Sequence, residues 1–320
     1  MKLGVFATLF AKLSLEEVLR KVQAAGLDAV ELGVGGFPGS DHLDVDGLLA
    51  SADRSRDLLA RVKDHGLIIS ALSCHGNPLH PNREIAQRDD AILRRAVRLA
   101  ERLEVPVVIT FSGCPGDSDE ARIPNWITSP WPPEMLQTLE WQWNEKAIPY
   151  WRDTTAYARE HGIRIALEPH PNFIVHNVDT ALRLRAAAGD HLGVNLDPSH
   201  MLWRGVDMPQ AIRALGPAIF HFHAKDVAID RGNTAVNGVI DGRSYRDLAQ
   251  RAWTFRSVGH GHDLLVWKQI MQALRIAGYD YVVSLEHEDA LMSTEQGFQT
   301  AIDTLKLALL RDPPDEPWWT

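Results

Sequence analysis

The sequence predicts an α/β fold in which a single (β/α)8 (TIM) barrel forms nearly the whole chain. Three observations lead to this prediction. Eight apolar runs of strand length alternate with amphipathic stretches along the chain. The runs are nearly continuous in apolar residues, which is typical of parallel strands that are covered on both faces. No Gly-x-Gly-x-x-Gly loop follows the first run, so an open sheet that binds a dinucleotide is not indicated.

The eight predicted strands are joined by helices whose ends can be recognised. We expect strands at residues 2–9, 29–34, 67–74, 106–112, 164–170, 192–197, 219–225 and 281–287. The segment Ser14–Glu17 is a capping box at the start of the first helix, and Gly26 stands where that helix should end. A helix, a glycine and then a strand also occur in this order before the third, fifth and eighth strands, which indicates a repeated unit.

Two long connections interrupt this regular pattern. Residues 113–133 are rich in Pro, Gly and Trp, and residues 226–261 form a second long connection after the seventh strand. Connections that follow barrel strands lie on the face where barrel enzymes build their active sites. We therefore expect one domain over residues 1–311, with both loops at its functional face, and a C-terminal extension over residues 312–320.

Composition narrows the classes of partner and compartment. The 320 residues carry a formal net charge of −9 and no block of lysine and arginine, whereas binding to a nucleic-acid backbone normally requires a basic surface. No apolar stretch approaches the roughly 20 residues of a membrane helix, and no signal peptide is indicated. The two cysteines form no disulfide framework. We expect a cytoplasmic protein without nucleic-acid or membrane partners, and a homo-oligomer is compatible with the sequence.

Carboxylates and histidines gather at the ends of the last four predicted strands. These residues are Glu168 and His170, Asp197 and His200, His221, His223 and Asp226, and Glu286, His287 and Glu288. Because the carboxyl ends of all barrel strands meet at one mouth, these distant residues should converge. A charge in an apolar strand is costly unless it is paired or binds a metal. The pattern therefore predicts a polar site at the mouth of the barrel.

Four of these residues form a set that suits a metal ion, and they are Glu168, Asp197, His223 and Glu286. Three carboxylates and one imidazole fit one divalent cation, with Mn²⁺ expected and Mg²⁺, Co²⁺ or Zn²⁺ as alternatives. Any one acid alone could instead cap a helix or pair with an arginine. Four such side chains, one on each of four successive strands, together favour a metal site. His221 and His223 point to the same side of their strand, so either histidine could be the ligand.

Other histidines near the predicted mouth are candidates for contacts with substrate hydroxyl groups or for proton transfer, and they are His75, His200, His260 and His262. For any one of these histidines taken alone, a structural role is more common than a functional one.

Four runs of residues resemble a known superfamily. The runs IALEPHP, VNLDPSH, FHFHAKD and SVGHGHDLLVWKQIMQALRIAGYDYVVSLEHED are similar to the xylose isomerase-like superfamily of sugar phosphate isomerases and epimerases, and the resemblance covers essentially the whole chain. This superfamily also contains DNA-repair enzymes of the endonuclease IV type, which carry extra histidine and acidic ligands for three zinc ions. Here the fourth strand ends in TFSGCPG and supplies no histidine, so the resemblance does not imply cleavage of DNA.

Carried over residue by residue, the resemblance implies the same four metal ligands. In the ketose 3-epimerases of the superfamily the two glutamates, which correspond to Glu168 and Glu286, also act as the acid–base pair across the substrate. The resemblance further implies substrate contacts by His200 and Arg256. Lys225 and Asp226 match a frequent His-x-Lys-Asp pattern of the family, which implies that they either contact the substrate or fix His223.

These features together predict a divalent-metal-dependent sugar (ketose) isomerase or epimerase. It would act by proton transfer through a metal-stabilised enediolate. One alternative is a lyase or dehydratase that acts by β-elimination on a 3-oxo-glycoside or a keto-inositol. The other is a non-catalytic, sugar-binding barrel subunit. No cradle of arginine and lysine for a phosphate group is evident in the sequence, so an unphosphorylated small sugar or sugar derivative is the expected partner.

Overall fold

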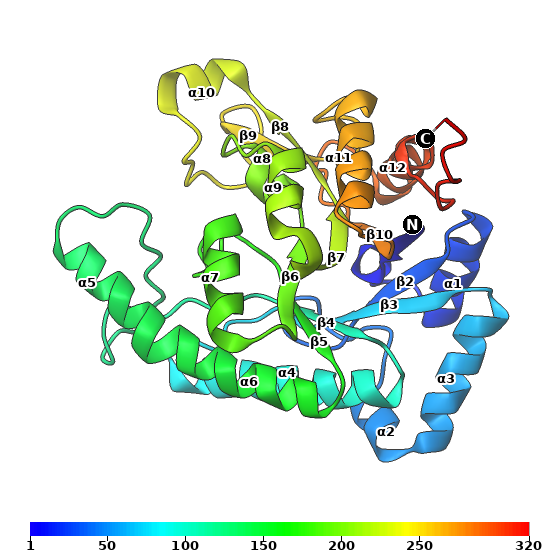
Figure 1. Ribbon diagram of the computed structural model, residues 1–320, viewed down its shortest axis with the longest axis horizontal. Helices are drawn as coiled ribbons and strands as arrows, with labels where there is room; N and C mark the ends of the chain where they lie inside the picture. Colours follow the sequence, from blue (N-terminus) through cyan, green and yellow to red (C-terminus); the bar gives the residue numbers. More distant parts are fainter. Residues whose placement is uncertain (320) are drawn as a thin grey trace.

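The computed structural model describes residues 1–319 and confirms the predicted fold class, because its parallel strands close into a barrel in the order β1-β10-β7-β6-β5-β4-β3-β2. These strands are β1 (Lys2–Phe6), β2 (Ala29–Gly33), β3 (Ile68–Ser73), β4 (Val107–Thr110), β5 (Arg164–Leu167), β6 (Leu192–Leu196), β7 (Ile219–Ala224) and β10 (Val282–Leu285). Every predicted strand is present, and the helices surround the barrel (Figure 1).

The barrel strands end earlier than the apolar runs suggested. For example, the fifth strand was expected to reach residue 170, but β5 ends at Leu167. The backbone N–H of Glu168 still donates to the Thr110 carbonyl oxygen at 3.0 Å, and the chain then leaves the sheet. Polar residues at the barrel mouth follow directly after β5, β6 and β10, and they are Glu168, Asp197 and Glu286.

Most of the helices are amphipathic and pack against the outside of the barrel. They are α1 (Leu15–Ala24), α2 (Val45–Ala50), α3 (Ala52–Asp64), α4 (Arg83–Arg102), α5 (Glu134–Trp141), α6 (Ile148–Glu160), α7 (Val178–Ala188), α8 (Ser199–Leu202), α9 (Met208–Leu215), α10 (Arg231–Asn237), α11 (Leu264–Ile276) and α12 (Thr294–Ala308). The predicted capping box of α1 is formed by Ser14 and Glu17. Gly26, just beyond α1, has a φ of 68°, which a glycine adopts without strain.

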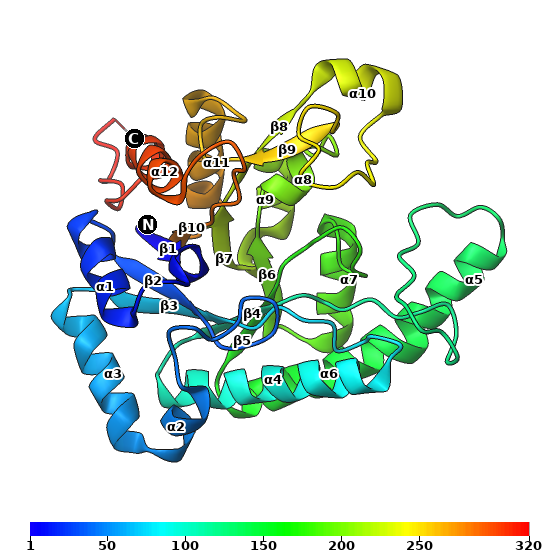
Figure 2. The same ribbon diagram turned by 180° about the vertical axis from the view of Figure 1, so that it is seen from behind.

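The long connection after β7 contains regular structure that the sequence analysis did not predict. Strand β8 (Asp226–Ile229) pairs antiparallel with β9 (Trp253–Arg256), and α10 lies between them. This insertion projects from the barrel in both views (Figures 1 and 2). The stacked rings of Trp203 and Trp253, 4.5 Å apart, pack its base against the segment after β6. The insertion is therefore attached to the mouth of the barrel by its own small apolar cluster.

The connection after β4 contains little regular structure. Residues 113–133 contain no helix or strand, and they lead into α5, which continues through a π-helical turn (Gln142–Ala147) into α6. The three segments form one long rod on the side of the barrel (Figure 1).

The two ends of the described chain lie close together (Figure 2). The amino group of Met1 contacts Asp280 Oδ1 at 2.6 Å and the carbonyl oxygens of Leu310 and Arg311 at 3.0 and 3.1 Å. Of the extension expected over residues 312–320, residues 312–319 contain no helix or strand, and Thr320 lies outside the described residues. Within residues 1–319, no helix is both long and apolar enough to cross a membrane.

Candidate active site

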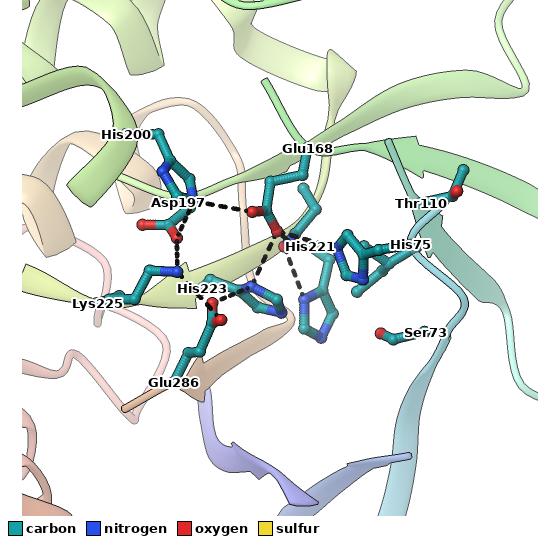
Figure 3. Close-up of polar contacts among 12 residues, drawn as sticks. Ser73, His75, Thr110, Glu168, Asp197, His200, His221, His223, Lys225 and Glu286 are labelled. Atoms are coloured by element: carbon teal, nitrogen blue, oxygen red, sulfur yellow. Dashed lines mark hydrogen bonds and ion pairs between the residues drawn. The ribbon is translucent and has the colours of Figure 1, made fainter. Parts of the chain in front are cut away.

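The structure brings the four predicted metal-binding side chains together at the mouth of the barrel (Figure 3). Glu168 follows β5, Asp197 follows β6, His223 lies near the end of β7, and Glu286 follows β10. These strands are neighbours in the barrel, so their ends converge although the residues are far apart in sequence. One ligand atom from each side chain lies within 4.8 Å of the others.

The donor atoms of this group have a geometry and chemistry that fit a divalent cation. His223 Nδ1 lies 2.9 Å from Glu286 Oε2 and 3.2 Å from Glu168 Oε2. His223 Nδ1, Glu286 Oε2 and Asp197 Oδ2 are buried and make no regular hydrogen bond among the described residues, although each lies within 3.1 Å of an ion-pair partner. A divalent cation bound between these three atoms would give each of them a direct bond. Three carboxylates and one imidazole are ligands that Mn²⁺, Mg²⁺, Co²⁺ and Zn²⁺ accept.

The balance of charge at the site also favours a cation. The Nζ atom of Lys225 lies 3.1 Å from oxygens of Asp197, Glu286 and Glu288. Burial alone would lower the pKa of Lys225, but these carboxylates outweigh burial and hold it well above its usual value. Glu168 is a fourth carboxylate of the site. These acids outnumber Lys225 and a protonated His200, so a divalent ion can neutralise the remaining negative charge.

Two histidines predicted to contact substrate lie beside Glu168. His200 Nε2 is 3.0 Å from Glu168 Oε1 and 3.1 Å from Asp197 Oδ2. Burial opposes protonation of His200, but the neighbouring carboxylates, chiefly Asp197, raise its pKa to about 9. His75 Nε2 lies 3.2 Å from Glu168 Oε2. Both imidazoles are therefore placed to orient the carboxylate of Glu168 and to meet a ligand bound next to it.

Glu31 on β2 also belongs to this site, although it was not among the predicted site residues. Its carboxylate is fully buried, and its oxygens lie 2.9 and 3.0 Å from His223 Nε2. The hydroxyl groups of Ser73 and Ser284 also donate to Glu31. Because Glu31 engages Nε2, the imidazole of His223 turns its Nδ1 towards the other carboxylates, as in the carboxylate–histidine pairs that support metal ligands.

The surroundings of His221 explain why His223 is the better candidate ligand. His221 Nδ1 lies 3.1 Å from Asn195 Oδ1, and its Nε2 lies 3.3 Å from Ser70 Oγ. Ligand atoms of Glu31, His221 and His223 also lie within 4.8 Å of one another. However, the atoms that face each other in this second group already have hydrogen-bond partners. The first group is therefore the stronger candidate for the metal.

The role of Glu31 gives a test of the site that does not depend on activity. We expect Glu31→Gln to weaken Mn²⁺ binding by about 10–100-fold, because the amide loses the charge that orients His223. Isothermal titration of the metal-free protein with Mn²⁺ measures this change. Glu160→Gln, an exposed position at the end of α6, serves as the matched control and should bind Mn²⁺ like the wild type. Equal affinities of the Glu31 and Glu160 variants would contradict the orienting role.

A cavity of about 380 Å³ opens beside the four residues. It is lined by Phe6, Thr8, Ala11, Phe37, Pro38, His75, Phe111, Glu168, His170, His200, Lys225, Glu286 and Glu288. The lining combines aromatic faces with a few convergent polar groups, as is typical of sites for small ligands. Both candidate catalytic glutamates reach this cavity, together with His75, His200 and Lys225 from the predicted substrate contacts.

The other three predicted substrate contacts, Asp226, Arg256 and His262, do not line the cavity. Their polar groups are engaged elsewhere. Asp226 accepts hydrogen bonds from the backbone N–H groups of Gly259, Gly261 and His262, and it contacts His262 Nδ1 at 2.8 Å. Arg256 Nε donates to Asp289 Oδ2 at 3.0 Å. These three residues hold the loops around the mouth in place, so we assign them a positioning role within the proposal below.

Comparisons with known proteins agree with the fold. Residues 19–308 match the family described as "Xylose isomerase-like TIM barrel". The chain is 39% identical over 309 residues to the uncharacterized protein YfiH of Bacillus subtilis (strain 168), an alignment that covers 96% of this chain and 98% of YfiH.

Solved structures with the same fold include two enzymes. The probable 3-DHS dehydratase AsbF of Bacillus anthracis has a TM-score of 0.68 and 18% identity, with 96% of this chain and 99% of AsbF covered. D-psicose 3-epimerase of Clostridium cellulolyticum H10, solved with D-tagatose, has a TM-score of 0.63 and 14% identity. The alignment covers 97% of this chain and 99% of the epimerase. Because the sequence identities are this low, the structural similarity to these two proteins establishes the fold alone.

Proposed function

Because the chain belongs to the xylose isomerase-like TIM barrel family, we propose that it is a divalent-metal-dependent isomerase or epimerase of a sugar. The observation that carries the proposal is the position of two carboxylates. Glu168 and Glu286 stand on β5 and β10, with β6 and β7 between them, and both line the same cavity. Between them lie Asp197 and His223, which complete the candidate metal site.

This arrangement suits proton transfer at a carbon next to a carbonyl group. When bound, a divalent cation supplies positive charge that stabilises the negative charge developing on the substrate oxygen. One of Glu168 and Glu286 removes the proton from carbon, and the other returns a proton from the opposite side or at the neighbouring carbon. The first outcome is epimerisation, and the second is isomerisation.

The remaining residues of the cavity position the substrate and the two carboxylates. His75 and His200 hold the Glu168 oxygens in place, and Lys225 does the same for Glu286. Lys225 and His200 are also donors that a substrate hydroxyl group can reach from the cavity. Phe6 and Phe111 line the same space and limit the access of water to the reacting carbon. Both cysteines are free and buried, which fits the cytoplasmic location that we propose.

A lyase that acts by β-elimination is the second candidate. The same base removes the proton next to the carbonyl, the bond from the adjacent carbon to the leaving oxygen breaks, and that oxygen takes up a proton. One observation favours this candidate. An apolar cavity adjoins the site through His170 and Glu288, and it offers space for a leaving group.

Deuterium exchange separates these reactions. We expect the Mn²⁺-loaded protein in D₂O to incorporate deuterium next to the carbonyl of at least one compound in a panel of ketoses and 3-oxo-glycosides. Nuclear magnetic resonance detects the exchange and the product. Incorporation without bond cleavage supports the isomerase or epimerase, and release of an aglycone or of water supports the lyase. Binding of a panel sugar without any exchange, or a protein that binds no divalent ion, would contradict both.

A further inference from the structure

A second cavity, of about 400 Å³, adjoins the candidate active site. We call it the side cavity, and it is lined by His170, Tyr245, Leu248, Thr254, Phe255, Glu288 and Ala290. His170 and Glu288 also line the cavity beside the metal-binding residues, so the two spaces meet at these side chains. The isomerase or epimerase reaction proposed above uses only the first of them, and only the alternative β-elimination gives the side cavity a use.

The lining of the side cavity is mainly apolar and aromatic. The rings of Tyr245 and Phe255 are stacked at 5.6 Å with an angle of 17° between their planes. Tyr245 is 55% exposed although Phe255 and Arg251 lie against its ring, so part of this residue is open to solvent. The one acid of the lining, Glu288, already contacts Lys225. An apolar, flat group would gain most by binding here, because it would cover exposed aromatic surface.

The walls of the side cavity are held in place before any ligand binds. Tyr245 lies in the insertion, and the buried guanidinium group of Arg251 stacks on its ring at 4.2 Å. Arg251 in turn donates to the carbonyl oxygens of Trp253 and Arg243. A site that is formed in advance loses little conformational entropy on binding.

Phe255 connects the side cavity to the chemistry of the site. Its ring lies 4.9 Å from Lys225 Nζ and meets the His200 ring edge-on at 5.6 Å. A molecule whose polar end reaches Lys225 and His200 would therefore place its next substituent over Phe255 and Tyr245. A free hexose at the carboxylates would leave this surface exposed to water.

We propose that the natural substrate is a sugar derivative with an apolar, flat substituent, such as an aromatic aglycone, and that the side cavity binds this substituent. The proposal rests on the proposed function, because it places the sugar ring beside Glu168 and Glu286. It assigns the specificity of the enzyme to the insertion between β7 and α11, which supplies Tyr245, Leu248 and Phe255.

Binding of unreactive probes tests this proposal. Phenyl and methyl glucopyranosides, each as both anomers, lack the carbonyl group and so cannot react. In titration calorimetry with the Mn²⁺-loaded protein, we expect one phenyl anomer to bind at least about tenfold more tightly than its methyl counterpart. Ala290→Trp, which fills the side cavity from an exposed position, should remove this preference. Tyr245→Ala, which removes one wall, should reduce it. Ala24→Trp, on the exposed face of α1, should keep it.

The proposal for the side cavity and the proposed function can fail independently, and the measurements tell the two failures apart. Equal affinity for phenyl and methyl glucosides, no binding of either, or a phenyl preference that Ala290→Trp and Tyr245→Ala leave intact would overturn the proposal for the side cavity. Titration with Mn²⁺ and deuterium exchange on the panel sugars report on the proposed function separately. Both should be retained in Ala24→Trp, because Ala24 lines neither cavity.

Discussion

Replacing either Glu168 or Glu286 by glutamine is expected to lower turnover by about 10²–10⁴-fold or more, on any compound for which the wild-type protein exchanges deuterium. The amide keeps the size of the side chain, but it can neither accept the proton from carbon nor return one. Both side chains line the cavity, and both contact His223 Nδ1, so each change also weakens the candidate metal site.

The measurement has to separate the loss of the base from the loss of the metal. The exchange rate is therefore followed over a series of Mn²⁺ concentrations and extrapolated to saturation. Glu288→Gln makes the same substitution on another acid of the cavity, one that contacts Lys225 but is not a candidate ligand. We expect this control to keep most of the wild-type rate. If the exchange rate of Glu168→Gln or Glu286→Gln at saturating Mn²⁺ stays near the wild-type rate, the assignment of these glutamates as acid and base is wrong.

The sequence predicted the barrel because its main signals are local. Each strand is a short apolar run, and several helices carry their own end signals, such as the capping box at Ser14. The carboxyl ends of the strands were less well predicted. Glu168 still makes one ladder hydrogen bond beyond the end of β5, so the change from strand to loop is gradual. The hydrophobicity of the sequence alone therefore does not show at which residue such a strand ends.

The site was predicted in part, for a related reason. Acids and histidines at the ends of successive strands converge in any parallel barrel, so the sequence could indicate Glu168, Asp197, His223 and Glu286. Glu31 escaped notice because it stands alone in the middle of β2, where only the closed barrel shows that it meets His223. A single acid inside an otherwise apolar strand was the available signal.

The loops were predicted least well, because their contacts are not local. The strands β8 and β9 have four residues each and lie 23 residues apart, with α10 between them, so no turn signal joins them. Arg256 matched a family pattern for substrate binding, but in the folded chain its guanidinium group meets Asp289. Which partner a loop side chain finds depends on the packing of several loops, and spacing in the sequence does not encode this.

Substitution of Asp226 is expected to have the second large effect, which is a loss of stability and not of catalytic chemistry. Its carboxylate is fully buried and faces only donors. Oδ2 accepts from the backbone N–H groups of Gly259, Gly261 and His262 and from Trp267 Nε1, at 2.9 to 3.1 Å. Oδ1 accepts from the N–H of Val227, and it contacts His262 Nδ1. The side chain thus closes the loop before α11 onto the start of β8.

We expect Asp226→Asn to lower the free energy of unfolding by about 2–4 kcal/mol, because an asparagine in either orientation turns its amide NH₂ group towards donors and leaves charge-assisted hydrogen bonds unmade. Urea unfolding of the metal-free protein, followed by circular dichroism, measures the change. Asp263→Asn makes the same substitution at the exposed start of α11, where asparagine is an equally good cap, and should have almost no effect. If Asp226 were instead a substrate contact, Asp226→Asn would unfold like the wild type and lose only substrate affinity. We expect the loss of stability instead, because both oxygens of this carboxylate are hydrogen-bonded to the protein itself.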